Sequence, residues 1–462
     1  MCRISAILQR LLSQAHKILL IALLARLLVG CQAMAPAPSE TAVPTDFEAN
    51  TPTATASRAL PTATLMPMPP VPTAATPFPP LAELPTSEIS YLIPLTLQQV
   101  SERSAQLLFE LDHAATGDLL LRVVDQRNNY VQSIPISPNL TYQQINLGPL
   151  EPGTAYEVVL GLRIPDGSYA QPAFLGAAWG SLRFHTQPTA EPLRVGVIGD
   201  SGFGEPVTAQ LAGLMAGHPL DFVIHTGDLV YKAGENASPA EAFSLKYFQP
   251  FAPLLHQLPI YPVPGNHDYA SDARVNGTPY YFHAFPPLSD AILAAQTSSA
   301  KRQYYALVYQ NIQFIFLDSQ VFFGEEGRLE QDTWLAQRLQ DDQFAYSVVI
   351  SHVPPFTSSA INTADSLAVR QAWQPLFASA HVPLVLSGHS HDYERLIVDG
   401  VTYLVSGGGS DVLYPIGARD PHSQAFSVSS HFVLLEFYED QIKILAIDKN
   451  GKILDQAQVP LP

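Results

Sequence analysis

Five short polar strings, each after an apolar run, constrain the fold of this chain more than any other feature of its sequence. They bring Asp, Asn, Tyr or His, and they lie at residues 199–202, 227–231, 265–268, 349–352 and 388–391. The apolar runs before them, such as residues 193–198, are rich in Val, Ile and Leu and are typical of buried strands. We therefore expect each string at the C-terminal end of a strand, where ligands collect in open α/β sheets.

Segments with helical spacing and good helix formers lie between the runs, for example residues 205–216 and 328–339. Strands that alternate with helices predict a layered α/β domain. We expect a two-sheet α/β sandwich over residues 190–462, with runs at 401–405 and 432–437 completing its second sheet. The glycines of the strings are expected to let the loops turn sharply, so that distant polar residues converge.

The side chains in the strings are those that hold hard and borderline metal ions. The strand-end aspartates Asp200 and Asp228 offer a carboxylate that can bridge two ions about 3.5–4 Å apart. Two such ions activate water near neutral pH and neutralise phosphoryl oxygens. His267, beside the predicted ligand Asn266, is a candidate general acid for a leaving alcohol.

The ordered strings resemble the calcineurin-like metallophosphoesterases over residues 190–445, and within them the purple acid phosphatases. The wider superfamily usually has Asp-x-His in the first string, but Gly202 stands where that His would be. Tyr231 lies three residues after Asp228, which matches the extra ligand of the subfamily. Residues 388–395 resemble the last motif of the subfamily with its Tyr-Glu-Arg continuation.

The resemblance implies a dinuclear centre of Fe(III) and a divalent ion, with Asp228 bridging. The implied ferric ligands are Asp200, Asp228, Tyr231 and His391. The implied ligands of the divalent ion are Asp228, Asn266, His352 and His389. A Tyr231 phenolate is a hard anionic donor that favours a trivalent ion, and it would give a violet charge-transfer colour. The mixed nitrogen and oxygen ligands of the second site fit Fe, Zn or Mn.

The implied activity is the hydrolysis of small phosphate monoesters by a metal-bound hydroxide. The alternative is a phosphodiesterase or nucleotide hydrolase of the same superfamily, because substrate choice depends on loops such as 269–300 and 353–366. A third hypothesis is a surface binding protein with an inert enzyme fold. Each string alone has an ordinary structural explanation, since Gly-Asp is a common turn pair. All five in this order favour the enzyme.

Other polar residues near the strings receive structural interpretations. His225 lies inside a predicted strand and is expected to be a core residue or a support for the ligands. Asp268 is expected to support His267 or the strand exit, and Asp318 is expected to be structural. His283 lies in an aromatic-rich insertion that could form a pocket wall, but a surface loop is the favoured interpretation.

The first thirty residues resemble a bacterial lipoprotein signal peptide. Arg3, Arg10 and Lys17 precede an apolar stretch at 18–29, which is broken by Arg26 and is too short to span a membrane. Residues 28–31 resemble a lipobox, which implies cleavage and lipidation of Cys31. The alternatives are an ordinary signal peptide or a membrane anchor. Cleavage would remove Cys2, the other cysteine, so we expect no disulfide. We therefore expect an extracytoplasmic protein that is lipid-anchored to a bacterial cell membrane.

Between this segment and the strings, the composition changes twice. Residues 31–85 are dominated by Pro, Thr and Ala, which predicts a disordered tether. Residues 86–189 show short apolar runs between turn residues, and 150–158 resembles the fibronectin type III pattern in which Tyr156 forms a tyrosine corner. An immunoglobulin-like sandwich of another family is the alternative.

The formal net charge of −17 bears on possible partners. Nucleic-acid binders place basic patches against phosphates, and no basic cluster follows the signal region, so nucleic acid is not expected as a partner. The oligomeric state is left open.

Overall fold

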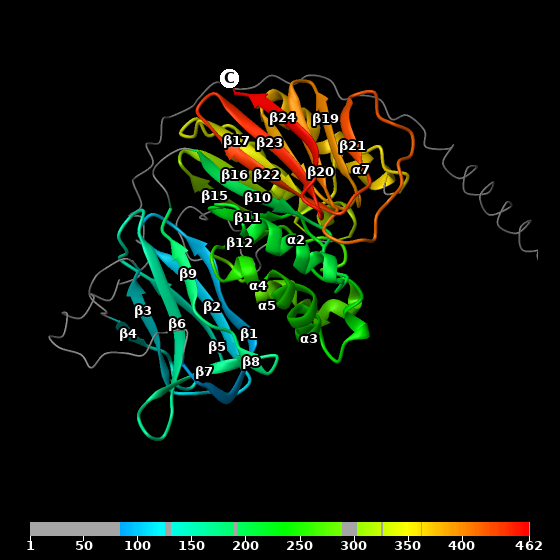
Figure 1. The fold of residues 1–462 in the computed structure, drawn as a ribbon. Coiled ribbons are helices and arrows are strands. Elements are labelled where there is room, and N and C mark those ends of the chain that lie inside the picture. The colour runs from blue at the N-terminus through cyan, green and yellow to red at the C-terminus, as the bar shows by residue number, and fades with distance from the viewer. Residues whose placement is uncertain are drawn as a thin grey trace, which may run out of the picture. The chain divides into compact units, whose positions relative to one another are not determined.

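The computed structural model describes residues 84–124, 131–187, 192–288, 303–324, 327–361 and 363–461. The predicted signal peptide, Cys31 and almost all of the predicted tether lie outside these residues. The elements form an N-terminal β region, residues 86–185, and an α/β domain, residues 193–460 (Figure 1). None of the helices in the described ranges has the length and apolarity needed to cross a membrane.

In the residues that the structure describes, the regular elements of the N-terminal β region are all strands. They are β1 (Thr86–Val100), β2 (Ala105–Leu111), β3 (Gly117–Val123), β4 (Gln132–Pro135), β5 (Tyr142–Leu147), β6 (Ala155–Arg163), β7 (Tyr169–Phe174), β8 (Ala177–Ala178) and β9 (Leu182–His185). Strand β1 pairs in parallel with β7 at Thr86 and Ser90, and antiparallel with β2 from Tyr91 onward. It therefore joins the β2–β5 half of this region to the β3–β6 half.

Tyr156 makes the contact that the sequence predicts for it. Its ring is buried at the start of β6, and its hydroxyl accepts a hydrogen bond from the Glu151 amide at 2.8 Å. This is the geometry of a tyrosine corner. Because β-sandwiches of more than one family make this contact, the fibronectin type III assignment stays a prediction.

The first sheet of the α/β domain has six strands. In spatial order they are β12 (Ile260–Pro262), β11 (Phe222–His225), β10 (Leu193–Ile198), β22 (His431–Phe437), β23 (Gln441–Asp448) and β24 (Ile453–Pro460). Strands β10, β11 and β12 are parallel, and β22 pairs antiparallel with β10. The C-terminal ends of three parallel strands therefore share one edge of this sheet.

The second sheet has seven strands. In spatial order they are β15 (Tyr305–Tyr309), β16 (Ile312–Leu317), β17 (Tyr346–Ser351), β18 (Leu384–Ser387), β20 (Val401–Ser406), β19 (Tyr393–Val398) and β21 (Ser423–Ser427). The predicted run at 401–405 is β20 of this sheet. The run at 432–437 is β22 of the first sheet, so its predicted placement was wrong. β20 is buried throughout and β22 largely so, and the apolar pattern of a run does not distinguish the two sheets.

The helices and short elements connect and cover these sheets. They are α2 (Pro206–Ala216), α3 (Pro239–Phe243), α4 (Gln249–Leu255), α5 (Tyr281–Ala284), α6 (Arg328–Leu339), α7 (Thr363–Ser379), the 3₁₀ turns η2 (Ala233–Glu235), η4 (Ser271–Ala273) and η6 (Ser319–Phe322), the π-helical turn η3 (Ser244–Phe248) and the hairpin β13 (Arg274–Val275) and β14 (Thr278–Pro279).

Alternate side chains along the strands pack into different apolar cores, one between the two sheets and others on the outer faces of the sheets. On β16, Phe314 and Phe316 point into the core between the sheets, whereas Ile315 and Leu317 pack with the outer cluster that contains Trp373 of α7. On β11, Phe222 and Ile224 face the other sheet and Val223 packs with the cluster of α2 and α4. The predicted α/β layering is thus confirmed, and it fixes the ends of the strands that carry the polar strings.

An ion pair between the two sheets yields a stability prediction. Arg395 of β19 binds Asp455 of β24 through two contacts, at 2.7 and 3.2 Å, and Tyr393 donates to the same carboxylate at 2.7 Å. Removal of one partner from a largely buried pair leaves the other unpaired. We expect Asp455→Ala to lower the free energy of unfolding in urea by about 2–3 kcal/mol.

The pH dependence of that loss follows from the carboxyl group. Burial favours the protonated form, but the hydrogen bonds from Arg395 and Tyr393 lower the pKa of Asp455 below its usual value. Its contribution is therefore present above the unfolded pKa of about 3.9 and is lost as the pH falls through the folded pKa. The exposed Asp440 provides the control, and an equal cost for Asp440→Ala would contradict this account.

Candidate metal centre

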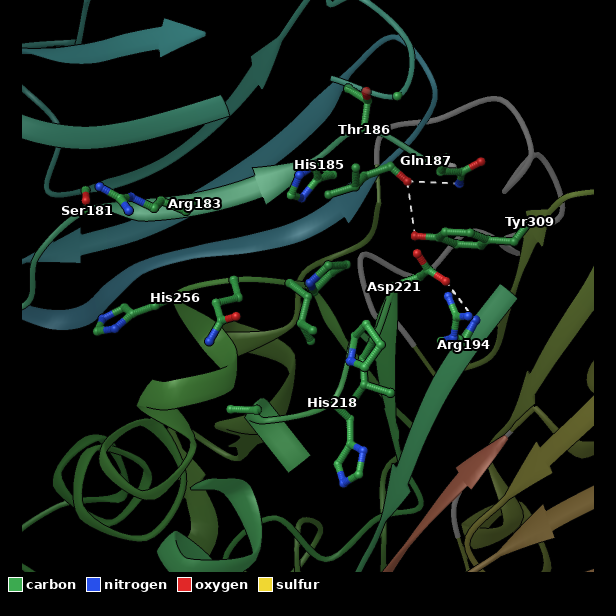
Figure 2. Close-up of a pocket in the computed structure, with 18 residues that line it drawn as sticks. Ser181, Arg183, His185, Thr186, Gln187, Arg194, His218, Asp221, His256 and Tyr309 are labelled. Atoms are coloured by element: carbon green, nitrogen blue, oxygen red, sulfur yellow. Dashed lines mark hydrogen bonds between the residues drawn. The ribbon is translucent and has the colours of Figure 1, made fainter. Parts of the chain in front are cut away.

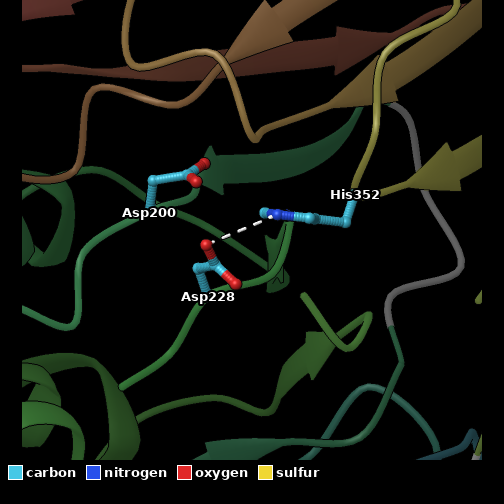
Figure 3. A group of neighbouring side chains, drawn as sticks. All are labelled: Asp200, Asp228 and His352. Atoms are coloured by element: carbon cyan, nitrogen blue, oxygen red, sulfur yellow. Dashed lines mark ion pairs between the residues drawn. The ribbon is translucent and has the colours of Figure 1, made fainter. Parts of the chain in front are cut away.

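The five polar strings meet at one place in the α/β domain. Strands β10, β11 and β12 of the first sheet and β18 of the second end no more than two residues short of their strings, and β17 of the second ends at Ser351, directly before His352. Asp200, Asp228 and His352 point toward one another there (Figure 3), and one ligand atom from each lies within 4.8 Å of the others. All three side chains are buried. Residues more than 120 positions apart thus share one polar centre, as the strand-end prediction requires.

Three of the predicted ligands form a first cluster. The Tyr231 hydroxyl lies 3.0 Å from Asp200 Oδ1 and 3.0 Å from His391 Nε2. His391 Nε2 is in turn 3.5 Å from Asp200 Oδ1. A carboxylate, a phenol and an imidazole therefore face one another, and this is the group that the resemblance implies for the ferric ion.

The other four predicted ligands form a second cluster around His352. Its Nε2 lies 3.1 Å from Asn266 Oδ1, 3.2 Å from His389 Nδ1 and 3.5 Å from Asp228 Oδ2. The Asp228 carboxylate also interacts with the Tyr231 hydroxyl. Asp228 is thus shared by both clusters, as a bridging ligand would be.

Backbone amides fix the orientation of both aspartates. The amide of His389 donates to Asp200 Oδ2 at 2.9 Å, and the amide of His267 donates to Asp228 Oδ1 at 2.8 Å. One oxygen of each carboxylate is therefore held by a loop from a different string. The other oxygen faces a cluster.

Asp268 holds the same loops together from behind. Its carboxylate accepts hydrogen bonds from the amides of Asp228, Leu229 and Gly265 at 2.8–3.0 Å. Of the two roles predicted for Asp268, the structure shows support of the strand exits.

Each of the three histidines directs one ring nitrogen toward the centre. His352 Nδ1 donates to the Thr226 carbonyl at 2.8 Å, and His391 Nδ1 donates to the Val412 carbonyl at 2.7 Å. Each bond assigns a proton to the outer nitrogen and directs Nε2 inward, so that Nε2 is the nitrogen that a metal ion would bind. His389 has the opposite orientation, with Nδ1 inward and Nε2 at 3.2 Å from Asp365.

The electrostatics of this centre fit bound cations. Burial alone would lower the pKa of His352, but the charge and hydrogen bond of Asp228 raise it to about 10. Burial raises the pKa of Tyr231 far above its usual value, and the charges of Asp200 and Asp228 raise it further. The carboxylates thus demand nearby positive charge, and a Tyr231 phenolate requires it. Carboxylate, amide, phenol and imidazole donors in two adjacent groups suit two metal ions.

The backbone is strained at three of the predicted ligands. Asp200, Asp228 and His389 have φ values of 57°, 55° and 65°, in the left-handed region that non-glycine residues rarely adopt. Strain of this kind persists where the surrounding structure enforces it, and it concentrates at functional sites.

The glycines of the strings serve close packing more than turning, which corrects our expectation. Gly227 has a positive φ of 103°, as a sharp turn requires. At Gly265, however, a Cβ would lie 2.1 Å from Asp228 Oδ1, and at Gly388 it would lie 2.4 Å from Asp200 Oδ2. These two positions must lack a side chain because the carboxylates occupy that space.

The remaining predictions near the centre have different outcomes. His267 is half-buried, with its ring centroid 4.2 Å from that of Tyr231. His225 is a core residue as expected: it bonds Ser201 at 2.8 Å, and burial lowers its pKa to about 4. Asp318 caps η6 and bonds Tyr269, a structural role. His283 lies in the short helix α5 and not in a loop, but its side chain is 41% exposed, and it contacts Glu110 of β2 at 2.8 Å.

Several supporting residues were missed because no motif marks them. Lys246, on the π-helical turn η3, donates to the backbone carbonyls of Tyr231 and Lys232 at 2.8 and 3.2 Å. Phe203 stacks on Tyr231 at 3.7 Å, and Tyr414 stacks on His391 at 4.0 Å. Only their positions could have indicated a role at the centre. Phe203 follows the first string directly, and Lys246 lies on a π-helical turn, an element that often marks functional sites.

A large cavity lies away from this centre. It has a volume of about 770 Å³ and is lined by residues of the N-terminal β region, such as Arg183, and of the α/β domain, such as Arg194 and His256 (Figure 2). None of the predicted ligands lines it. Among the described residues, the group of His, Asp or Glu side chains with metal-ligand spacing lies at the strand ends instead, so the chemistry places the functional site there.

Comparison with known proteins agrees with this geometry. Residues 193–393 match the sequence model of the calcineurin-like phosphoesterase family. Purple acid phosphatase 23 of Arabidopsis thaliana is 25% identical over 311 residues, which cover 61% of this chain and 64% of the relative. Purple acid phosphatase 22 of the same plant is 24% identical over 254 residues, covering 54% and 52%. The chain thus matches between half and two thirds of the length of these relatives.

The fold also has a solved counterpart. The purple acid phosphatase PPD1 from yellow lupin (Lupinus luteus) seeds superposes with a TM-score of 0.62 at 15% identity, covering 79% of this chain and 74% of that one. This likeness concerns the fold alone. The match of residues 193–393 to the calcineurin-like phosphoesterase model, together with the relatives named purple acid phosphatases, supports a hydrolase with a metallophosphoesterase domain.

Gly202, where the sequence departs from the wider superfamily, yields the next prediction. A Cβ there would lie 2.2–2.4 Å from the backbone of Leu229 and Val230, next to Tyr231. Gly202→Ala should therefore displace the loop that carries Asp228 and Tyr231. We expect it to lower the free energy of unfolding by about 1–3 kcal/mol and to reduce the bound metal, as measured by denaturation and elemental analysis.

Gly213 is the matched control, because it lies in α2 and a Cβ there meets nothing within 4 Å. Gly213→Ala should be neutral or stabilising by up to about 1 kcal/mol with unchanged metal content. Equal behaviour of the two variants would contradict the role assigned to Gly202.

Proposed function

We propose that the phosphoesterase domain hydrolyses phosphate monoesters with a dinuclear centre of Fe(III) and a divalent Fe, Zn or Mn ion. One observation carries this proposal: seven donor residues form two adjacent clusters that share Asp228. The phenol of Tyr231 in the first cluster favours the trivalent ion there. The match to two relatives named purple acid phosphatases supports the same assignment.

When bound, the metal ions supply activation of water and neutralisation of phosphoryl charge. The residues of the chain hold the reactants in place. The amide of Asn266 and the imidazoles of His352 and His389 would hold the divalent ion, while Asp200, Tyr231 and His391 would hold the ferric ion. Backbone amides hold Asp200 and Asp228, and backbone carbonyls hold the two histidines His352 and His391, so these groups need little reorganisation during the reaction.

His267 is the proposed general acid. Its amide is anchored on Asp228 Oδ1, which keeps the residue next to the centre, and its ring is half-buried beside Tyr231. An imidazole that borders both the ligands and solvent can deliver a proton to the oxygen of the leaving alcohol. The ring then regains a proton from water.

The setting of the reaction is a separate part of the proposal. The lipobox-like residues 28–31 support lipidation of Cys31 and an extracytoplasmic enzyme on a bacterial cell membrane. The following Pro-rich segment would be a tether, and the N-terminal β region would be a fibronectin type III-like spacer. Small phosphate esters are the proposed substrates, and the formal charge of −17 disfavours nucleic acid.

Replacement of the bridging residue tests the proposed activity. Asp228→Asn should abolish hydrolysis of p-nitrophenyl phosphate and lower the bound metal, because the amide lacks the charge that both ions share. Rates between pH 4 and 9 and elemental analysis measure the two effects. Asp399→Asn, on an exposed loop, is the control. An active Asp228→Asn variant, or a wild type that prefers bis(p-nitrophenyl) phosphate, would count against a monoesterase.

The role of His267 predicts a dependence on the leaving group. An alkyl alcohol needs a proton as it leaves, whereas p-nitrophenolate hardly does. His267→Ala should therefore reduce kcat on an alkyl phosphate by about 10²-fold or more and affect p-nitrophenyl phosphate much less. Equal losses on both substrates would exclude His267 as the general acid.

A further inference from the structure

We infer that Asp365 positions His389 as a ligand of the divalent ion and thereby sets the affinity of that ion, with no effect on the ferric ligands. The inference rests on the proposed dinuclear centre. No sequence motif marks Asp365, which lies 13 residues after His352 and carries no recognisable string around it.

The orientation of His389 gives the first argument. In His352 and His391, a backbone carbonyl holds Nδ1 and the Nε2 atom points inward. In His389, Nδ1 lies 3.2 Å from His352 Nε2, and Nε2 lies 3.2 Å from Asp365 Oδ2. A carboxylate acceptor places the proton on Nε2, so that Nδ1 keeps its lone pair for the ion.

The chemistry of the acceptor gives the second argument. A carboxylate on the outer nitrogen of a ligand histidine fixes its ring and raises its basicity, and loss of such a partner typically reduces metal affinity 10–100-fold. Of the three predicted ligand histidines, His389 is the one whose outer nitrogen is held by a charged side chain. Its affinity for the ion should therefore respond to substitution of that side chain.

The position of Asp365 gives the third argument. It lies in the first turn of α7 (Thr363–Ser379), where the helix dipole favours a carboxylate. Its side chain is 42% exposed, whereas that of His389 is 8% exposed. The contact thus connects a buried ligand to the rim of the centre, and a substitution at the exposed end leaves the core packing unchanged. At Asp200 and Asp228, which are fully buried, a substitution would change the ligands and the core packing together.

The test compares Asp365→Asn and Asp365→Ala with the wild type, each as the full chain loaded with iron and zinc. Zinc affinity is measured by competition with a chelator, and iron by elemental analysis and the visible charge-transfer band. We expect zinc to bind 10–100-fold more weakly in both variants, with iron content and the band unchanged. Asp399→Asn is the control, because Asp399 contacts Gln374 of the same helix and no predicted ligand.

Each other outcome overturns the inference for an identifiable reason. Unchanged zinc affinity in both Asp365 variants would show that His389 needs no such partner. Loss of zinc and iron together, with a lower unfolding midpoint of the metal-free protein, would show that Asp365 merely stabilises α7. A wild type that binds fewer than two metal ions would instead refute the dinuclear centre, and the proposed function with it.

Discussion

The burial of two carboxylates, Asp200 and Asp228, is the constraint on which the rest of the centre depends. Both side chains are removed from water, and each is fixed by a single backbone amide from another string. Amides alone do not offset the cost of burying this much negative charge. A bound cation would offset this charge. The inward nitrogens of three histidines and the oxygen of Tyr231 are further ligands for such a cation, which explains why all of these groups converge.

The fold provides this arrangement at some cost in backbone strain. Parallel strands from two sheets bring their C-terminal ends to one edge, and the apolar core between the sheets holds those ends in register. Asp200, Asp228 and His389 then adopt left-handed φ values directly after their strands or glycines. Closely packed glycines leave room for the carboxylates, so the loops have little freedom to relax.

Much of this arrangement was predictable because local sequence determines it. Apolar runs ending in Asp, Asn or His indicated strands and their ends, and the seven predicted ligands do lie together. The sheet membership of β22 was not predictable, because its pairing with β10 is non-local and both sheets have the same apolar pattern. Asp365 and Lys246 were missed for a similar reason. They reach the centre through helices whose packing, and not their own sequence, brings them there.

The central claim is that one ion lies in each cluster and that Asp228 touches both. Anomalous diffraction from crystals of the metal-loaded protein tests it most directly. The account predicts two peaks about 3.5–4 Å apart, one beside Tyr231 and His391 and one beside Asn266 and His352, with Asp228 between them. A single peak, or two peaks neither of which contacts Tyr231, would contradict it.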